Sequence, residues 1–364
     1  MNPAGEVLVF ATQHMPAGGI ESHLQEFCRH LSRSGVALDL IITDSRMDPG
    51  TEKLFRRHCR RVYLGKLGKS SLRTLWLLRT GLLSWPRKYT AVYTNGQGES
   101  ILPLKRLVRA DRWIHHHHTS GDAADQATWG AGYRKVLGSA DTVIACSRHN
   151  AGMMHTALGR NIDVIPCFSR EILPERRPAG PEGRIRFGYY GRLIPEKGID
   201  LLCRLSTDPE CRHLEFHIWG EGEAYPPAFF SRYPNVRYHR TFRGPAELGI
   251  VLGSIDGFLL LSRHPEGLPI CLLEAMSAGI PWLATDRGGI RDIACDPLAT
   301  RLISNEIPNG ADYAAARAAV LAFADDIRSG RISPDRQVRR YRELFSAARI
   351  TDRWRTCLGL NQPS

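Results

Sequence analysis

The sequence predicts an α/β protein of two domains, each built on a parallel β-sheet. The chain has 364 residues, enough for two or three domains of about 150 residues. Short apolar and β-branched runs alternate with stretches of helical spacing, which favours parallel strands covered by helices. A segment rich in Pro, Gly and charge at 169–183 is typical of a linker. We therefore expect one domain at 1–168 and a second at 184–334.

The first domain is predicted from strand-like apolar runs and the helical spacing between them. A helix over 22–32 follows the first run, because Leu24, Phe27, Cys28 and Leu31 recur at helical spacing. The predicted strands are 7–11, 38–43, 91–94, 112–116, 142–146 and 163–165. Their alternation with helical stretches predicts one parallel sheet.

Two adjacent glycines, Gly18 and Gly19, lie between the first strand and its helix. Glycines at this place allow a ligand to approach a helix N-terminus, where free amides favour anions. The stretch does not match the Gly-x-Gly-x-x-Gly fingerprint of dinucleotide-binding domains. A tight turn without a ligand therefore stays open as the alternative.

Four consecutive histidines, 115–118, end a predicted strand. Neighbouring strand side chains point to opposite faces, so the four cannot all bind one metal ion. We expect no metal site here. His118, at the carboxyl edge of the strand, is the candidate for contact with a ligand, and the other three are expected to be packing or surface residues.

The charge of the chain is concentrated in one segment. The chain holds 49 basic and 37 acidic side chains, a formal net charge of +12, and the stretch from Lys53 to Lys88 contains 11 basic residues and no acid. Its apolar part, 72–85, is interrupted by Arg73 and Arg79, which fits an amphipathic segment on anionic lipid. An ordinary helix that packs its Leu face on the sheet is the alternative. A nucleic-acid partner is not expected, because no recognised nucleic-acid motif occurs.

The cysteines and the N-terminus indicate a cytoplasmic protein. The nine cysteines are scattered and form no Cys-x-x-Cys pair, which argues against a disulfide framework and a zinc ribbon. The N-terminus lacks the basic and apolar regions of a signal peptide. No run reaches the roughly 18 apolar residues of a membrane span. The basic segment allows a peripheral position on the inner face of the cell membrane.

The second domain begins with a strand that leads into a glycine-opened loop. This strand is expected at 185–190 and is followed by Gly191, Arg192 and Lys197. Ligands of parallel sheets bind at this carboxyl edge, where Arg and Lys can neutralise a diphosphate. Solvated surface cations are the alternative. The further predicted strands are 215–219, 236–239, 257–261, 281–285 and 301–303.

The most informative stretch follows the strand at 257–261. Pro269 fits the first turn of a helix and Gly279 its end, which predicts a helix over 269–278. Glu266 then lies in the loop before this helix and Glu274 within it. Carboxylates here can accept hydrogen bonds from the hydroxyls of a sugar, although Glu274 as a solvated helix residue is the alternative. The amides expected to face the same side as Glu266, as a phosphate cradle, are those of Gly267, Leu268 and Ile270.

Taken in order, these motifs resemble one known family. The chain from 16 to 292 resembles family 4 of the retaining glycosyltransferases, which have the GT-B fold. The resemblance implies two Rossmann-like domains that face each other across a cleft. It also implies that a C-terminal helix, 335–364, packs back on the N-terminal domain, in keeping with the helical spacing of the tail. The matching motifs are Gly18-Gly19-Ile-Glu21, Gly191-Arg192-Leu-x-x-Glu196-Lys197-Gly198, Gly220-x-Gly222, Glu266-x(7)-Glu274-Ala-Met-x-Ala-Gly-x-Pro281 and Thr285-Asp-x-Gly-Gly289.

The resemblance also implies roles for individual residues. Arg192 and Lys197 would contact the donor's diphosphate, Glu266 the hydroxyls of the donor sugar, and Glu274 the ribose. His118 would lie near the transferred sugar. The catalytic candidates are therefore His118, Arg192, Lys197 and Glu266. The donor-binding candidates are Gly18, Gly19, Gly191, Arg192, Lys197, Gly220, Gly222, Glu266, Gly267, Leu268, Pro269, Ile270 and Glu274. The chain departs from the family pattern at Leu268-Pro269, Arg287 and Asp292, so the donor's identity stays open.

The activity implied by the resemblance is hexosyl transfer with retention. The donor would be a nucleotide diphosphate sugar based on UDP or GDP, and the acceptor a glycan or a lipid-linked molecule in cell-surface polysaccharide, lipopolysaccharide or glycolipid synthesis. Attack from the front face would need no protein nucleophile. No metal and no cofactor are expected, and no Asp-x-Asp motif occurs. A sugar-nucleotide epimerase or hydrolase of the same fold is the alternative.

Overall fold

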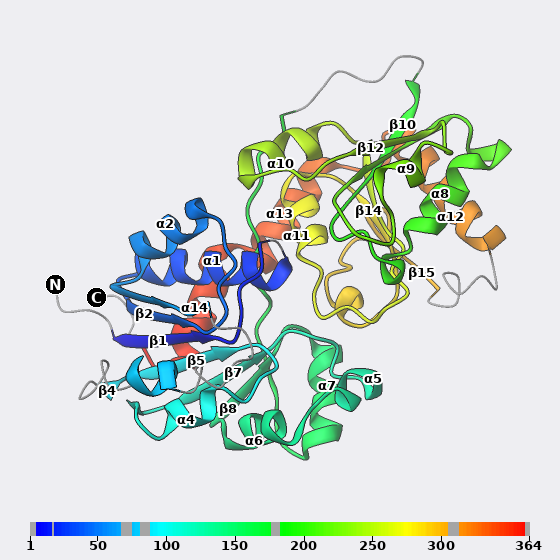
Figure 1. Ribbon diagram of the computed structural model, residues 1–364. Coiled ribbons are helices and arrows are strands. Elements are labelled where there is room, and N and C mark those ends of the chain that lie inside the picture. The colour runs from blue at the N-terminus through cyan, green and yellow to red at the C-terminus, as the bar shows by residue number, and fades with distance from the viewer. Residues whose placement is uncertain are drawn as a thin grey trace. The chain divides into compact units, whose positions relative to one another are not determined.

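The structure is a computed structural model that describes residues 5–16, 18–66, 75–80, 88–175, 183–304 and 313–360. It divides into unit 1, formed by Met1–Phe168 and Ala347–Ser364, and unit 2, formed by Ser169–Ser346. Each unit holds a parallel sheet with helices (Figure 1). The predicted fold class is confirmed.

The main sheet of unit 1 has seven parallel strands in the order β3-β2-β1-β5-β7-β8-β9. The sequence of strands reverses between β1 and β5, the kind of place where such sheets bind ligands. The strands are β1 (Glu6–Ala11), β2 (Ala37–Ile42), β3 (Arg61–Leu64), β5 (Ala91–Asn95), β7 (Trp113–His117), β8 (Thr142–Ala145) and β9 (Asp163–Val164). A separate two-stranded sheet joins β4 (Lys88–Tyr89) and β6 (Arg109–Ala110).

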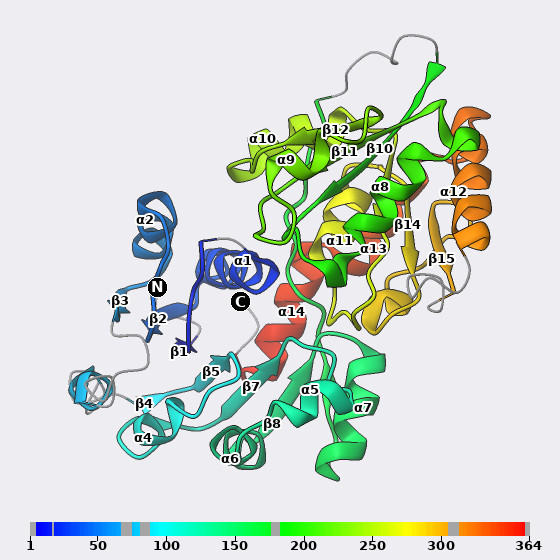
Figure 2. The same ribbon diagram turned by 45° about the vertical axis from the view of Figure 1, so that its right-hand side comes forward.

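Helices cover both faces of the seven-stranded sheet (Figure 2). Side chains of β1 alternate between the faces, as a strand requires. Val7 and Val9 pack in one core with Phe27, whereas Leu8 and Phe10 pack in the other. The helices of unit 1 are α1 (Gly19–Arg33), α2 (Pro49–His58), α4 (Ile101–Lys105), α5 (Ala123–Ala127), α6 (Ala131–Ser139), α7 (Arg148–Leu158) and α14 (Ala347–Cys357).

Unit 2 holds a six-stranded parallel sheet in the order β12-β11-β10-β13-β14-β15. Its switch in strand order lies between β10 and β13. The strands are β10 (Ile185–Tyr190), β11 (Leu214–Trp219), β12 (Val236–His239), β13 (Gly257–Leu260), β14 (Trp282–Thr285) and β15 (Thr300–Ile303). The helices are α8 (Ile199–Thr207), α9 (Pro227–Phe230), α10 (Gly244–Gly253), α11 (Ile270–Ser277), α12 (Tyr313–Arg328) and α13 (Pro334–Phe345), with short 3₁₀ turns η2 (Pro195–Lys197), η3 (Pro209–Cys211) and η4 (Gly289–Asp292).

The tail differs from the single helix that the sequence predicts. The backbone at Ser346 is extended, with ψ at 148°, and separates α13 from α14. α13 belongs to unit 2, where the Tyr341 hydroxyl lies 3.0 Å from Ser169 Oγ. α14 belongs to unit 1, where Arg355 donates to the carbonyl of Ser34 over 2.9 Å. Only the second part of the tail therefore packs on the N-terminal unit.

The segment predicted as a linker is partly built into unit 2. Residues 169–175 lie in that unit, and Ile172 is buried and donates its amide proton to Ser277 Oγ over 2.9 Å. Residues 176–182 lie outside the described residues. Residues 169–175 therefore belong to unit 2, because the side chain of Ile172 is buried there and its backbone amide is hydrogen-bonded.

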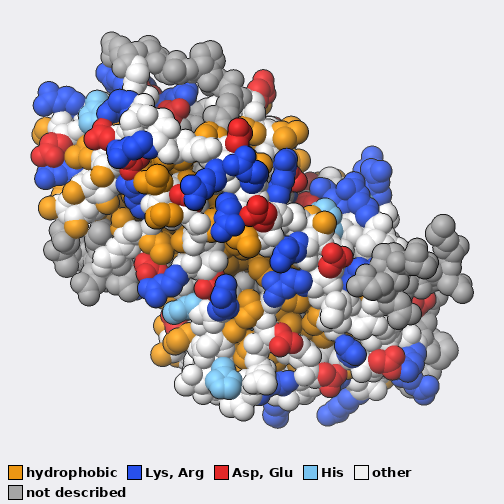
Figure 3. All heavy atoms as spheres, turned by 180° about the vertical axis from the view of Figure 1, so that it is seen from behind, with side chains coloured by type: hydrophobic (Ala, Val, Ile, Leu, Met, Phe, Trp, Pro, Cys, Tyr) orange, Lys and Arg blue, Asp and Glu red, His pale blue; other side chains and the backbone are white. Residues whose placement is uncertain are grey.

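The basic segment from Lys53 to Lys88 is described only in part. Its predicted amphipathic stretch, 72–85, lies outside the described residues except for 75–80, which are helical. Within that turn Leu77 is buried and Leu75 is 64% exposed. Figure 3 shows basic side chains spread over the visible face, with acidic side chains among them. None of the helices in the described ranges has the length and apolar character needed to cross a membrane.

Candidate functional site

The candidate site of unit 2 lies where the strand order reverses. β10 and β13 are neighbours in the sheet, and the loops that follow them leave the same carboxyl edge. In an open parallel sheet, such a switch point is the usual place for a ligand. The loop after β10 carries Arg192 and Lys197, and the loop after β13 carries Glu266.

A lysine and a carboxylate pair closely at this edge. Lys197 Nζ lies 2.6 Å from Glu266 Oε1, and the Ser262 hydroxyl donates to the same oxygen over 2.6 Å. Glu266 is buried, at 8% exposure. Among the described residues, no hydrogen bond or ion pair engages Glu266 Oε2. The site therefore offers a carboxylate with one oxygen fixed and the other open to a hydroxyl donor. Ser262 was not predicted.

The second carboxylate, Glu274, is buried rather than solvated. It is 2% exposed and lies on α11, where Arg170 Nε contacts Oε1 at 2.7 Å and the Tyr190 hydroxyl donates to Oε2 over 2.8 Å. The alternative of a solvated helix residue is therefore wrong. Burial, followed by the charge of Glu274, raises the pKa of Tyr190, so its hydroxyl keeps its proton as a donor. Arg170 and Tyr190 were not predicted, because one was placed in the linker and the other in a strand.

Glycines let the loops at this edge touch backbone to backbone. A Cβ atom on Gly222 would lie 2.0 Å from the carbonyl oxygen of Leu193, and one on Gly220 would lie 2.0 Å from that of Gly191. Gly288 has a φ of 60°, and a Cβ there would lie 2.2 Å from the carbonyl oxygen of Glu266. Any larger residue would push these loops apart. The glycines thus fix the loops that carry the candidate charges.

Arg192 and the start of α11 complete the predicted donor set. Arg192 is exposed, and in the described part of the chain its guanidinium forms no ion pair. The helix begins at Ile270, so Pro269 takes the N-cap position instead of the first turn. Leu268 and Ile270 are buried. Gly267 lies in the sequence between Glu266 and these buried residues, which anchor the loop on the side of α11.

The predicted residues of unit 1 lie at the carboxyl ends of β1 and β7. Gly18 is the N-cap of α1 and Gly19 its first residue. The carboxylate of Glu21 turns back and accepts the amide proton of Met15 over 3.2 Å. The Gly-Gly-Ile-Glu motif therefore shapes a turn and keeps a carboxylate near the helix N-terminus.

His118 follows β7 and is enclosed by aromatic and sulfur-containing side chains. Its ring centroid lies 5.0 Å from that of His23, and its Nδ1 lies 3.6 Å from the sulfur atoms of both Cys146 and Cys167. Burial lowers the pKa of His118, so the ring is neutral at neutral pH. Its Nε2 is buried and has no hydrogen-bond partner among the described residues. The predicted histidine thus lies at the expected strand end.

Two family models match this chain. The model described as Glycosyltransferase Family 4 matches residues 17–168, and that described as Glycosyl transferases group 1 matches residues 184–325. The chain belongs to the family 4 glycosyltransferases. The resemblance to this family that the sequence motifs indicated is confirmed. One of the two matches falls in each unit of this glycosyltransferase.

Individual relatives agree with the family. A GDP-mannose-dependent alpha-mannosyltransferase of Mycolicibacterium smegmatis is 29% identical over 194 residues, which cover 52% of this glycosyltransferase and 46% of that protein. The matched part thus spans about half the length of the curated relative. The structure resembles sucrose-phosphate synthase from Thermosynechococcus elongatus, with a TM-score of 0.77, 17% identity and 97% and 98% of the two chains covered. It also resembles Anabaena HepE in complex with UDP and glucose, with a TM-score of 0.71, 16% identity and coverage of 98% and 99%.

Proposed function

We propose that this chain moves a hexosyl group from a nucleotide diphosphate sugar to a glycan or lipid-linked acceptor, with retention of the anomeric configuration. The observation that supports a donor-binding site is the cluster of Lys197, Glu266 and Ser262 at the carboxyl edge of β10 and β13. It combines a cation for phosphate with a carboxylate for hydroxyls at the switch point of the sheet. The named mannosyltransferase relative supports the same class of reaction.

The cations serve the diphosphate. Lys197 already neutralises Glu266, and the exposed Arg192 adds a planar fork of donors on the same loop. Fixed positive charge at the leaving diphosphate stabilises the negative charge that develops there. No side chain is assigned as a nucleophile, and an oxygen of the departing diphosphate takes the proton of the acceptor hydroxyl. No metal is assigned to the donor.

The carboxylates serve the hydroxyls of the donor. Glu266 Oε2 accepts a hydrogen bond from a hydroxyl of the transferred sugar, because Oε1 is already bound by Lys197 and Ser262. Glu274 binds the ribose through the lone pairs that Arg170 and Tyr190 leave unused, since each carboxylate oxygen accepts more than one hydrogen bond.

A thermal-shift panel of UDP, GDP and ADP tests the donor site. A ligand that binds only the folded protein adds about 2.7 kcal/mol of stability at a concentration 100 times its Kd. We expect one nucleoside diphosphate to raise the unfolding temperature, and Lys197→Met to reduce the shift. Arg240→Met is the control, because Arg240 is an exposed cation of the same unit. The donor site is refuted if no diphosphate shifts unfolding.

Product analysis tests the reaction itself. With the sugar donor of the responsive nucleotide and a glycan or lipid-linked acceptor, we expect transfer with the anomeric configuration of the donor, measured by nuclear magnetic resonance. Release of free sugar or conversion of the donor, at the full turnover rate and without acceptor, would instead identify a hydrolase or an epimerase.

A further inference from the structure

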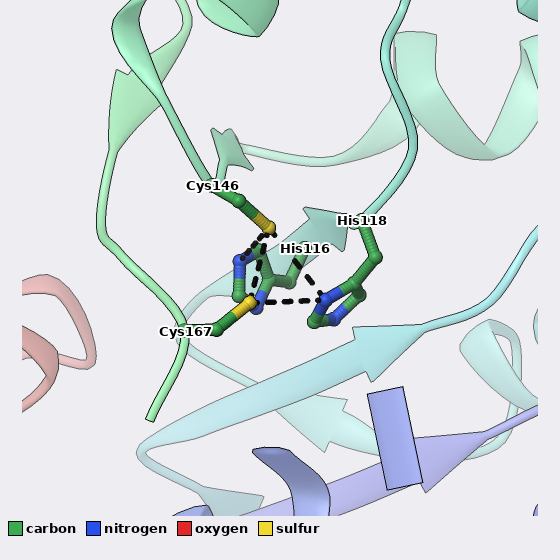
Figure 4. A group of neighbouring side chains, drawn as sticks. All are labelled: His116, His118, Cys146 and Cys167. Atoms are coloured by element: carbon green, nitrogen blue, oxygen red, sulfur yellow. Dashed lines mark hydrogen bonds between the residues drawn. The ribbon is translucent and has the colours of Figure 1, made fainter. Parts of the chain in front are cut away.

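Four potential metal ligands converge in the interior of unit 1. His116 lies in β7 and His118 directly follows it, whereas Cys146 follows β8 and Cys167 follows β9. One ligand atom from each lies within 4.8 Å of all the others. Figure 4 shows both sulfur atoms and both imidazole rings pointing toward one another. His116, Cys146 and Cys167 are each at most 3% exposed.

The alternation of β7 explains why two of the four consecutive histidines meet the cysteines. Side chains two positions apart lie on the same face of a strand. His115 and His117 both contact the Tyr133 hydroxyl, at 2.9 and 2.8 Å. His116 and His118 turn to the opposite face, where the cysteines lie. The rule that four adjacent histidines cannot share one ion therefore still permits a pair of them to do so.

The spacing of the four ligand atoms approaches that of a tetrahedral zinc site. Zinc bonds of roughly 2.3 Å to sulfur and 2.0 Å to nitrogen give edges of about 3.8 Å between sulfurs and about 3.5 Å between sulfur and nitrogen. The two sulfurs lie 3.3 Å apart, and Cys146 Sγ lies 3.3 Å from His116 Nε2. His118 Nδ1 lies 3.6 Å from each sulfur. Small side-chain rotations therefore suffice to make the tetrahedron.

We propose that His116 Nε2, His118 Nδ1, Cys146 Sγ and Cys167 Sγ form a structural zinc site. Two thiolates and two imidazoles favour zinc over the hard cations, and four protein ligands leave no open position on the metal. Binding releases the two thiol protons to solvent, because thiolates are the ligands. This site is separate from the donor residues of unit 2, which are assigned no metal.

A neighbouring hydroxyl supports the required state of His116. The other ring nitrogen, Nδ1, lies 3.0 Å from the Tyr93 hydroxyl oxygen, which also lies 3.1 Å from His23 Nε2. A hydroxyl oxygen has two lone pairs, so Tyr93 can accept a hydrogen bond from each of the two rings. With its proton on Nδ1, His116 presents the lone pair of Nε2 to the metal. Such partners commonly orient histidine ligands in zinc sites.

The zinc ion would join the ends of three neighbouring strands. β7, β8 and β9 lie side by side in the sheet, and each contributes at or just beyond its carboxyl end. The ion would also hold His118 by Nδ1, which places the ring proton on Nε2. The site itself is tested without reference to activity.

The metal content of the purified protein decides the proposal. We expect protein expressed with added zinc and purified under reducing conditions, without chelator, to hold about one zinc ion per chain. Cobalt(II) in its place should give the charge-transfer absorption of thiolate ligands and the visible bands of four-coordinate cobalt. Cys146→Ser and Cys167→Ser should each lower the zinc content at least about tenfold. Cys357→Ser, which changes a cysteine on α14 of the same unit, should leave it unchanged.

Other results would overturn the zinc site. Wild-type protein without zinc and with both thiols free, or with a Cys146–Cys167 disulfide found by peptide mass spectrometry, contradicts it. Unchanged zinc in the double Cys146→Ser, Cys167→Ser variant also contradicts it. If serine variants do not fold, the zinc content and the cobalt spectrum of the wild type decide. Because these measurements need no donor, failure of the zinc site is distinguishable from failure of the nucleotide panel.

Discussion

Glu266 and Glu274 belong to one short segment, yet their hydrogen-bond partners differ. Glu266 is held at one oxygen by Lys197 and Ser262. Glu274 is held at both oxygens, by a guanidinium at one and a phenol at the other. Under the proposed function, we expect Glu274 to be a fixed acceptor for a ribose hydroxyl, and Glu266 to accept a hydrogen bond from the transferred sugar through its second oxygen.

Replacement of Glu266 by Gln tests its role at the residue scale. Gln keeps an oxygen that accepts from Ser262 and Lys197, so we expect the fold to persist. The charge is lost, and we expect kcat/KM for transfer to fall by at least about 100-fold, the usual cost of one precise electrostatic contact. The measurements are transfer kinetics and thermal unfolding. Glu343→Gln, an exposed carboxylate of α13, should leave both unchanged. Turnover near that of the wild type in Glu266→Gln would refute the role.

Residues that act together are harder to predict than those that act in a motif. Lys197 and Glu266 were both named from the sequence, because each lies in a recognisable loop after a strand. Arg170 was not predicted as a site residue, because its neighbours in the sequence resemble a linker and its partner Glu274 lies 104 residues away along the chain. Cys146 and Cys167 likewise meet His118 only because β7, β8 and β9 are adjacent in the sheet.

At the scale of elements, strand positions were predictable and strand order was not. Predicted strands agree with the observed ones within one or two residues, because each is a buried apolar run. β3 was missed because it lies in the basic segment and is only half-buried. The sheet order that creates the site between β10 and β13 depends on long-range pairing, which no local pattern encodes. The tail was predicted as one helix because helical spacing continues across the break at Ser346.

The packing of α14 on unit 1 should contribute substantially to its stability. Trp354 is fully buried, and its ring centroid lies 5.2 Å from Phe27 and 5.3 Å from Tyr93. We expect Trp354→Ala to destabilise unit 1 by roughly 3–5 kcal/mol, the usual cost of removing a buried tryptophan. Urea unfolding followed by circular dichroism measures this. Asp352→Ala, at an exposed position of the same helix, should change stability by less than about 0.5 kcal/mol. Equal urea midpoints of unfolding for Trp354→Ala and Asp352→Ala would contradict the packing role of Trp354.

At the scale of the whole molecule, part of the basic segment is neutralised by the fold. Arg60 pairs with Glu6 at 2.8 Å and with Asp39 at 3.0 Å. Arg56 pairs with Glu52 at 2.7 Å, and Lys88 with Asp111 at 2.5 Å. The absence of acids between 53 and 88 in the sequence therefore overstates the charge that this segment offers to a partner. The cations that remain available for an anionic surface include Lys53, Arg57 and Lys66, which are exposed and, within the described residues, form no ion pair.

We propose that these exposed cations hold the protein on anionic lipid, where a lipid-linked acceptor would lie. Each Lys or Arg near such a surface contributes about 1 kcal/mol of binding. Reversal of Lys53, Arg57 and Lys66 to Glu should therefore weaken flotation with phosphatidylserine vesicles at least about tenfold. Binding of the wild type should fall as salt rises, because salt screens surface charge. Reversal of Arg212, Arg237 and Arg240, exposed cations of unit 2, makes the same change in net charge and should have little effect. Absence of wild-type binding at low salt, or equal loss in both variants, would exclude this surface and leave the donor site unaffected.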